Sequence, residues 1–551
     1  MSDSARQRVL ALPELVESIL SSVQDRKDLV SALTTNKQLF FVGRKVHWRA
    51  LEGESDFKML LRLLAPLQEQ HETDSLVRFV RHPMPKAWEQ FDGYADLIHS
   101  ITLPDLHEFK AICTTIAQTR PLDSVLLRNL YYLRFSAYDV DDDLVHYVQF
   151  MVPSVIKLDF KLTGRDSFEL HSSMRFFFSC ISSRLNHLRS LSISLATIKS
   201  HPVSFISLLA HTLEGLKSLE CVVLPPCVVV GKVITSLSHH PHLVEINPAH
   251  GSLAPVEAYS IASCFRSSPE LRNLAFPSLD ALSFCASPQI AHALLMNPHF
   301  PANQMSRIHV QTFSQKHRRG EPDPVEPLIQ AIASNCTNIQ DVTITEIRRP
   351  NPRIDLVLSY RSIHAILRCT SITSLKIEFR GCLPWTVQDV NVLASSLPAA
   401  TTLLLNEAPS HPVEPALRIE TALSAFSCHC PKLRQLGFYF DARSKPHFSD
   451  DQYSEDLHIP RFQSLVTLHV GLSLITSSSQ NIVDVAALLI VVLPRGCKMR
   501  WTRQAASGFV VDTDDVDTDD ESSVLSMEEN NCAWQRVDQL RDLHGRLPSL
   551  Q

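Results

Sequence analysis

The sequence predicts an α/β fold in which a small helical module precedes a long stack of alternating helices and parallel strands. A short apolar motif recurs along the chain at steps of about 27 to 36 residues, a spacing typical of repeat proteins. Glycine is scarce, with 14 among 551 residues, which argues against glycine-rich phosphate-binding turns. The N-terminal segment lacks the motif and shows helical spacing of its apolar residues instead.

Residues 8–52 are predicted to form the helical module, with three short helices. Pro13 suits the first turn of the first helix, where a missing N–H costs nothing. Asp25 and Asp28 favour the start of the second helix, because acidic groups stabilise its positive end. The module is expected to end near Trp48 and Leu51. The apolar residues of the three helices are Leu15, Ile19 and Leu20, then Leu29, Val30, Ala32 and Leu33, then Leu39, Phe40 and Val42.

Residues 53–95 contain Pro83 and Pro85 and are predicted to be a semi-structured bridge between the module and the repeats. The repeats are expected to occupy residues 96–505. Their clearest copy is Leu188-Arg189-Ser190-Leu191-Ser192-Ile193. Further copies are at 216–221, 271–276, 339–344, 372–377, 433–438 and 465–470, with weaker ones near Val125, Val155, Leu243, Ile308 and Leu403.

Each repeat is predicted to contain one helix followed by one strand. Residues 204–213 have helical spacing, and Leu219, Cys221 and Val223 alternate directly after them. One such unit cannot bury its apolar face, whereas stacked units form a continuous core. This pattern resembles the leucine-rich repeat, although no copy shows the asparagine that strict members carry after the strand. The alternative is an ordinary α/β domain with parallel strands, which would have a less regular step.

The chain is predicted to end in two different segments. Residues 506–531 are rich in aspartate and poor in aromatic residues, so this acidic segment is expected to be disordered. Residues 532–551 are predicted to form an amphipathic helix, because Trp534, Val537, Leu540 and Leu543 recur at helical spacing.

The N-terminal module resembles the F-box. The resemblance rests on a Leu-Pro-Glu-Leu opening at 12–15, an Ile-Leu pair at 19–20, an Asp-Leu start at 28–29 and a Trp-x-x-Leu close at 48–51. It implies docking on a Skp-type adaptor, which joins such modules to a cullin. Carried over by position, the docking face and its support would be Leu12, Pro13, Leu15, Ile19, Leu20, Leu29 and Leu33.

Two considerations qualify this implication. Residues 37–40 are Lys-Gln-Leu-Phe where family members usually have a basic residue and Trp, so weaker docking is expected. The alternative is that the module only caps the open end of the repeat array, as such arrays require for solubility.

No catalytic or metal-binding motif is predicted. The chain lacks a Gly-x-Ser-x-Gly elbow, a P-loop and a His-Glu-x-x-His sequence. Cys428-His429-Cys430 has no second cysteine pair at ligand spacing, and residues 239–242, His-His-Pro-His, are expected in a turn. The aspartates at 139 and 141–143 lack the Gly and Glu of an EF-hand, so a helix-capping role is expected. The sequence therefore favours a protein that is not an enzyme and uses no cofactor or metal.

Charge and hydropathy predict a cytoplasmic or nuclear protein. The formal net charge is −6, and no basic face typical of nucleic-acid binders is evident, so neither nucleic acid nor a membrane is an expected partner. The N-terminus shows no secretory signal, and the longest apolar run, 485–493, is about half a membrane span. The 13 cysteines are scattered singly, as expected for reduced thiols.

The predicted function is that of a substrate receptor in a Skp–cullin–F-box-type ubiquitin ligase. The alternative is a non-catalytic repeat scaffold for protein–protein interaction without a ubiquitin role. An unknown target protein is expected on the concave face, where strand residues between the buried leucines are exposed. The predicted target-binding residues are Lys157, Asp159, Lys161, Lys376, Glu378, Arg380, Tyr439, Asp441 and His469.

Overall fold

The structure is a computed structural model of the whole chain. It describes residues 12–501 and 521–546 apart from 24, 70–75, 122–123, 139–143, 164–171, 197–202, 226–227, 250–268, 313–324, 347–359, 380–382, 384, 408, 410–414, 416 and 446–458. The chain divides into two compact units. The first comprises Met1–Ile261 and Phe276–Ser278, and the second comprises Ala262–Ala275 and Leu279–Gln551.

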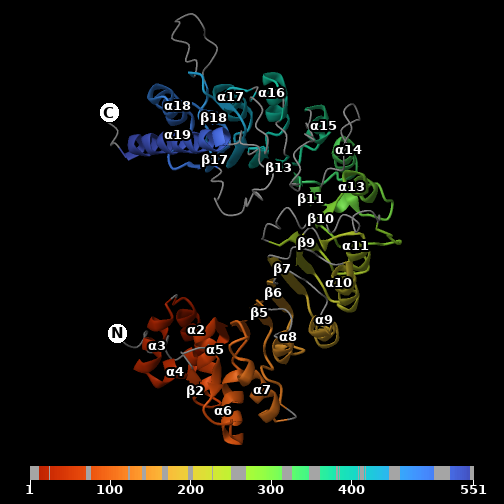
Figure 1. Cartoon of the computed structure of the whole chain (residues 1–551), viewed down its shortest axis with the longest axis vertical. Coiled ribbons are helices and arrows are strands. Elements are labelled where there is room, and N and C mark those ends of the chain that lie inside the picture. The colour runs from red at the N-terminus through yellow and green to blue at the C-terminus, as the bar shows by residue number, and fades with distance from the viewer. Residues whose placement is uncertain are drawn as a thin grey trace, which may run out of the picture. The chain divides into compact units, whose positions relative to one another are not determined.

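Three helices form the N-terminal module of the first unit, as the sequence predicts (Figure 1). They are α2 (Pro13–Ser21), α3 (Arg26–Thr35) and α4 (Lys37–Arg49). Pro13 begins α2, and the Asp25 carboxylate caps α3 by accepting a hydrogen bond from the Lys27 N–H at 2.7 Å. Asn36 caps α4 in the same way through the Gln38 N–H at 2.8 Å. Short polar caps therefore separate the three helices.

The segment after the module is packed rather than semi-structured. Strand β1 (Ala50–Glu52) is followed by α5 (Glu54–Arg62), the antiparallel pair β2 (Leu67–Glu69) and β3 (Val77–Phe79), and α6 (Pro85–Ala95). Phe57 and Trp88 are fully buried. β1 pairs in parallel with β4 (Ser100–Leu103), so the sheet of the repeats already begins at Ala50.

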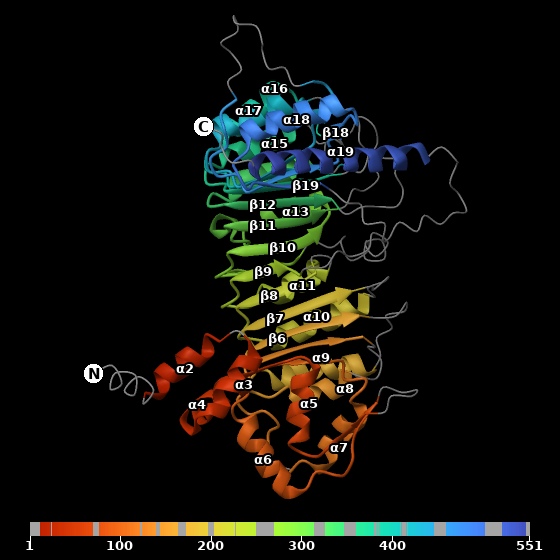
Figure 2. The same ribbon diagram turned by 90° about the vertical axis from the view of Figure 1, so that its left-hand side faces the viewer.

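Seven parallel strands form the sheet of the first unit in chain order. After β1 and β4 come β5 (Tyr132–Ala137), β6 (Lys157–Thr163), β7 (Ser190–Ala196), β8 (Cys221–Leu224) and β9 (Glu245–Pro248). The connections contain α7 (Lys110–Thr119), α8 (Leu144–Tyr147), the 3₁₀ turn η1 (Val148–Phe150), α9 (Ser172–Arg184), α10 (Val203–Gly215) and α11 (Gly231–Leu237). Figure 2 shows β6 to β9 side by side with α9 to α11 behind them.

Eight parallel strands form the sheet of the second unit, again in chain order. They are β10 (Ala281–Ala286), β11 (Arg307–Thr312), β12 (Asp341–Glu346), β13 (Ser374–Glu378), β14 (Thr402–Leu405), β15 (Gln435–Phe438), β17 (Thr467–Gly471) and β19 (Lys498–Trp501). A short parallel pair joins β16 (Asp441–Ala442) to β18 (Leu474–Ile475).

The helices of the second unit alternate with these strands. They are α13 (Pro288–Leu295), η4 (Ala302–Gln304), α14 (Val325–Asn335), α15 (Tyr360–His364), η5 (Ala365–Arg368), α16 (Val387–Ser396), α17 (Ile419–His429), α18 (Ser479–Val492) and α19 (Glu521–Arg546). α19 begins well before residue 532, inside the segment predicted to be disordered. The long terminal helix packs along α18.

The core of each unit lies between its sheet and its helices. In β6 the residues at alternate positions are buried, as the period of two requires. Phe160 of β6 meets Phe177 of α9, with ring centroids 5.4 Å apart. Within each unit, parallel strands follow one another in chain order and alternate with helices, which confirms the predicted leucine-rich-repeat-like α/β fold.

Two of the predicted repeat copies are misplaced. Residues 271–276 contain turns instead of a strand: Leu274 and Phe276 have positive φ, and the Leu274 side chain is 87% exposed. The strand of that repeat is β10, whose motif begins eight residues later at Leu279. Likewise, the copy near Val125 precedes a turn, and β5 follows the motif that begins at Leu130. At both places an apolar run with the spacing of the motif precedes the true strand, so the sequence pattern alone does not show which of the two runs forms the strand.

One repeat does carry an asparagine after its strand, so the expectation that no copy has one is wrong. Asn406 follows β14 directly, is buried and has a φ of 52°. Its side-chain oxygen accepts a hydrogen bond from the Phe379 N–H at 3.0 Å, and its own N–H donates to the Ile377 carbonyl at 2.7 Å. Asn406 thus satisfies backbone groups of the preceding repeat, which is the role of this residue in strict leucine-rich repeats.

Candidate protein-interaction surfaces

The first helix of the module has apolar residues on two faces. Val16 and Leu20 point inward and are buried. Leu12, Leu15 and Ile19 lie on the neighbouring face of the helix and are 49%, 43% and 51% exposed. Spacings of three and four residues place these three side chains in one row along α2. We call this row, together with the exposed Pro13, the α2 stripe.

The inward face of the module is a small core of its own. Leu20, Leu29 and Leu33, which the F-box resemblance assigns to docking, are buried there with Val16 and Val42. They therefore support the exposed residues and do not form part of the surface. A Cβ on Gly43 would overlap Leu33 Cδ2 and lie 2.8 Å from Leu20 Cδ1. The absence of a side chain at Gly43 lets α4 approach α2 and α3 closely.

Two exposed aromatic residues on α4 were not among the predicted docking residues. Phe40 and Phe41 are 43% and 58% exposed, and their rings meet edge to face with centroids 6.0 Å apart. The Arg44 guanidinium lies 5.7 Å from the Phe41 ring. The sequence signal for this pair was the doublet itself, since two adjacent helical positions cannot both face one core.

The module is joined to the first repeat by a charged contact. Arg26 of α3 pairs with the Asp56 carboxylate of α5, which is nearly buried and also accepts the Glu52 N–H at 2.8 Å. Arg26 donates a second hydrogen bond to the His47 carbonyl at 3.3 Å. Burial, reinforced by the charge of Arg26, lowers the pKa of His47. These contacts hold the module in a defined orientation on the first unit.

In the first unit the described helices α9 to α11 lie behind β6 to β9 (Figure 2), and we call the other face of this sheet the first open face. Its residues come from the strand positions that alternate with the buried ones, and strand register aligns them in rows. One row runs Ser100, Tyr132, Lys157, Ser190, Cys221, Glu245; the next runs Thr102, Arg134, Asp159, Ser192, Val223, Asn247; a third contains Ser136, Lys161 and Ser194.

The charges of the first open face concentrate on β5 and β6. The Lys157 ammonium lies 4.7 Å from the centre of the Tyr132 ring. Asp159 forms an ion pair with Arg134 Nε at 3.4 Å and accepts a hydrogen bond from the Tyr132 hydroxyl at 3.4 Å. Burial and the nearby Asp159 charge raise the pKa of Tyr132. The predicted residues Lys157, Asp159 and Lys161 are therefore together on one surface.

We call the corresponding face of the sheet in the second unit the second open face. Several of its charged side chains form ion pairs with one another. Lys376 pairs with Glu378 at 2.9 Å on the same strand, so part of the predicted charge is already neutralised. His469 Nδ1 lies 3.3 Å from Glu407 Oε1. Glu407 covers Gly437, where a Cβ would overlap its carboxylate. The Glu407 side chain thus contacts residues of the next two repeats, Gly437 of β15 and His469 of β17.

Two of the predicted target-binding residues, Tyr439 and Asp441, do not lie on this face as expected. Tyr439 is only 6% exposed, so its predicted exposure is wrong. Asp441 belongs to the separate β16–β18 pair, where its two oxygens receive Arg443 Nε and Nη2 at 3.0 Å each. The alternation that placed both residues ends with β15 at Phe438. Arg380 lies outside the described residues.

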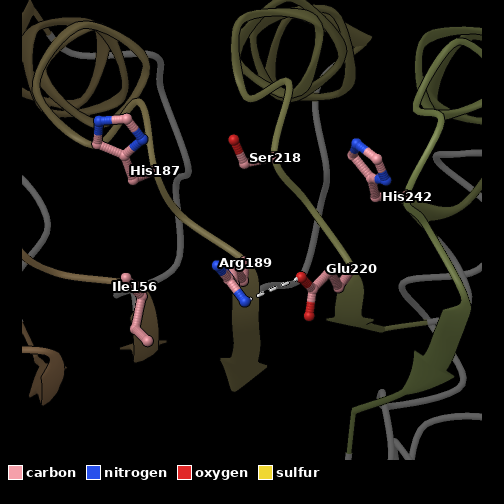
Figure 3. Close-up of a pocket in the computed structure, with 6 residues that line it drawn as sticks. All are labelled: Ile156, His187, Arg189, Ser218, Glu220 and His242. Atoms are coloured by element: carbon pink, nitrogen blue, oxygen red, sulfur yellow. Dashed lines mark ion pairs between the residues drawn. The ribbon is translucent and has the colours of Figure 1, made fainter.

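A pocket of about 420 Å³ lies at the turns that precede β6 to β9. Figure 3 shows His187, Ser218 and His242 in successive turns, with Arg189 and Glu220 directed toward each other. The Arg189 Nη1 to Glu220 Oε1 distance is 3.4 Å, and both side chains are largely exposed. An exposed ion pair of this kind contributes little energy. The pocket is a shallow part of the surface formed by equivalent positions of neighbouring repeats.

The histidine and cysteine clusters of the sequence do not form a metal site in the part of the chain that the structure describes. Cys430 is buried, its thiol donates to the Ala394 carbonyl at 3.4 Å, and burial raises its pKa to about 12. Cys428 is exposed. His240 is buried with Nε2 2.9 Å from the Leu213 carbonyl, whereas His242 is exposed. Residues 139–143, the aspartate cluster, lie outside the described residues.

No protein-family model matches the sequence, and no curated protein matches it. Among solved structures, a chain of a TLR13–ssRNA13 complex is similar, with 12% sequence identity and a TM-score of 0.28. The similarity covers 82% of this chain and 63% of that one. Among the described helices, none is long and apolar enough to cross a membrane.

Proposed function

We propose that this protein is the substrate receptor of a Skp–cullin–F-box-type ubiquitin ligase. The N-terminal module docks on a Skp-type adaptor, through which it reaches a cullin, and the repeats bind a target protein. Other subunits supply the catalysis, so the chain itself needs no active site, metal or cofactor. Such a receptor works in the cytoplasm or the nucleus. A fold of stacked repeats supports a role as a protein-interaction scaffold in general.

The observation that carries the proposal is the α2 stripe. Leu12, Leu15 and Ile19 are each more than 40% exposed, although Val16 and Leu20 already anchor the same helix to the module core. A row of exposed apolar side chains supported by a rigid core is a typical helix-docking surface. These three positions are also ones that the F-box resemblance assigns to adaptor contact.

The stripe also favours docking over the capping alternative. A cap needs only an apolar inner face and a polar outer one, because its outer face meets water. The module has apolar residues outside as well as inside, and Phe40 and Phe41 extend this property to α4. A protein that exposes such residues without a partner gains nothing in stability and increases its tendency to aggregate.

Co-purification with a Skp-type adaptor tests the proposal. The full chain is expected to capture the adaptor, and the double variant Leu12→Asp, Ile19→Asp is expected to lose at least about tenfold in affinity. Two charges would then be placed in an apolar contact without partners. Both side chains are exposed, so the variant should fold normally.

The matched control carries two apolar-to-aspartate changes at equally exposed positions elsewhere, Met296→Asp and Val483→Asp. This control should capture the adaptor like the unaltered chain. If the unaltered, folded chain captures no adaptor, the ubiquitin role is excluded. The alternative, a repeat scaffold whose module is only a cap, would then be the better account.

A further inference from the structure

We infer that the first open face binds an acidic segment of the target protein in extended conformation, with two carboxylates four residues apart. This inference rests on the proposed function, because it specifies which target chemistry the repeats of that receptor recognise. It concerns the side chains of β5, β6 and β7 only, all of which lie within the first unit.

The charges of this surface favour an acidic ligand. Its strand positions on β5 to β7 carry three cations, Arg134, Lys157 and Lys161, and one anion, Asp159. Arg134 is engaged by Asp159. Lys157 contacts the Tyr132 ring, and Lys161 makes no ion pair with any described residue. Two lysines on one strand therefore have their charge available for a ligand.

The strand geometry sets the spacing of the ligand's carboxylates. Lys157 and Lys161 are four residues apart on β6 and point to the same side, which places them about 13 Å apart. An extended peptide that lies along β6 has the same rise per residue, so its positions i and i+4 match the two lysines. Across the strands no such match exists, because the register partners of both lysines on β7 are Ser190 and Ser194.

Asp159 makes the match selective. It lies midway between the two lysines and would face position i+2 of the bound segment. An acidic residue there would be repelled, so the preferred ligand is acidic at i and i+4 and not acidic at i+2. Ser190, Ser192 and Ser194 on β7 flank this track with small hydroxyl-bearing side chains. They leave room for the ligand backbone and can donate hydrogen bonds to it.

A polypeptide ligand fits this surface better than a nucleic acid. Nucleic-acid binding depends on many phosphate contacts and on stacking against aromatic rings. Here two available lysines stand on either side of a carboxylate, and the Tyr132 ring is covered by Lys157. The chain as a whole carries a formal charge of −6, which also disfavours a polyanion.

Fluorescence anisotropy with the full chain and short labelled Ser/Gly peptides tests the inference. A peptide with glutamates at positions 4 and 8 is expected to bind with a Kd of about 1 mM or lower. A peptide with glutamates at 4, 6 and 8 should bind more weakly despite its additional charge. Asp159→Ser should reverse that order, because it removes the central repulsion. No binding of the 4,8 peptide, or tighter binding of the 4,6,8 peptide to the unaltered chain, contradicts the inference.

Two variants locate the site. Lys157→Glu with Lys161→Glu should weaken binding of the 4,8 peptide at least about tenfold, whereas the control Lys217→Glu, at an exposed position off this face, should change it less than about twofold. A single-stranded DNA oligonucleotide that binds more tightly than the peptide would overturn the assignment in favour of nucleic acid. A phosphoserine peptide that binds where the glutamate peptide does not would overturn the carboxylate assignment.

The same variants separate this inference from the proposed function. Adaptor capture depends on the α2 stripe, so the Lys157→Glu, Lys161→Glu chain should still capture the adaptor fully. Loss of peptide binding with retained capture supports the inference. Capture without any peptide binding by the unaltered chain contradicts the inference alone, whereas peptide binding without capture contradicts the receptor role alone.

Discussion

Gly471 shows how a single residue determines the packing of two repeats in the second unit. It ends β17 with a φ of +52°, and a Cβ at this position would overlap the backbone carbonyl of Glu407. That carbonyl accepts the Leu472 N–H at 3.0 Å. Close approach of two backbones and left-handed geometry together require glycine here.

Gly471→Ala is therefore expected to destabilise the second unit by about 2–4 kcal/mol, through backbone strain and steric overlap. Urea denaturation measures the change. The control is Gly496→Ala, whose φ of +83° is also left-handed but whose Cβ would meet no atom within 4 Å. That variant should lose only about 1 kcal/mol, and equal losses in both would show that the contact with Glu407 is unimportant.

His309 is predicted to make the second unit sensitive to acid. Its ring lies 3.1 Å from Ser283 Oγ and 3.4 Å from Thr345 Oγ1, and burial, aided by Lys376, lowers its pKa from 6.5 to about 4. Between these values the unfolded chain binds a proton that the folded one does not. The free energy of unfolding must therefore fall as the pH decreases from about 6.5 to about 4.

The expected loss from this group is about 2 kcal/mol between pH 7 and pH 5. Denaturation of the unaltered chain and of His309→Gln at both pH values separates the contribution of His309 from that of the other titrating groups. The variant should show the smaller pH dependence. Identical slopes for the two proteins would contradict the pKa assigned to His309.

The sequence predicts exposed and buried side chains well where the chain is regular. The sequence does not distinguish the exposed residues of the α2 stripe from the buried residues Val16 and Leu20, and it does not predict the contact of His469 with Glu407. Both depend on which helix or repeat is adjacent in space. Tyr439 was misassigned because the alternation of β15 was extended past its last residue, Phe438.

At the scale of whole elements, α19 is the clearest case of a helix held by specific contacts. The indole N–H of Trp534 donates to the Ser473 carbonyl at 2.8 Å, and its ring meets Phe440 edge to face at 5.9 Å. Asn530 bonds both the Ser473 carbonyl and the Ile475 N–H. Trp534 and Val537 are fully buried, whereas Leu543 is 61% exposed.

Trp534→Ala is expected to release α19 from the second unit. The loss of a buried indole and its hydrogen bond costs about 3–5 kcal/mol. Limited proteolysis should then cleave within 521–546 much faster than in the unaltered chain. Leu543→Ala is the matched control and should leave both stability and cleavage unchanged, within about 0.5 kcal/mol. Equal cleavage rates in all three proteins would show that the helix is not held by Trp534.

Helices and strands could be predicted because each has its own period of apolar residues, 3.6 or 2. Most repeats were found in this way. The errors at Leu271 and Val125 arose where a second apolar run of similar spacing preceded the true strand. β1 is not predicted because a strand of three residues shows hardly any alternation. The early part of α19 is not predicted because its acidic composition is typical of a solvated segment.

At the scale of the whole chain, strand order was predictable for a physical reason. A repeat that buries its apolar face only against its neighbours must stack in sequence order, and both units do so. Which surfaces bind partners could be predicted only in part, because exposed charges are common on any strand. The structure adds the register that aligns Lys157, Asp159 and Lys161 with the serines of β7.

A receptor of this kind has two binding surfaces, the α2 stripe and the first open face, and a bridging experiment examines both at once. A Skp-type adaptor is immobilised, the full chain is added, and retention of the labelled peptide with glutamates at positions 4 and 8 is measured. We expect the peptide to be retained only when the chain is present. Retention should be lost both in the double variant Leu12→Asp, Ile19→Asp and in the double variant Lys157→Glu, Lys161→Glu. If the folded chain is not retained, or is retained without the peptide, the claim of a two-surface receptor is contradicted.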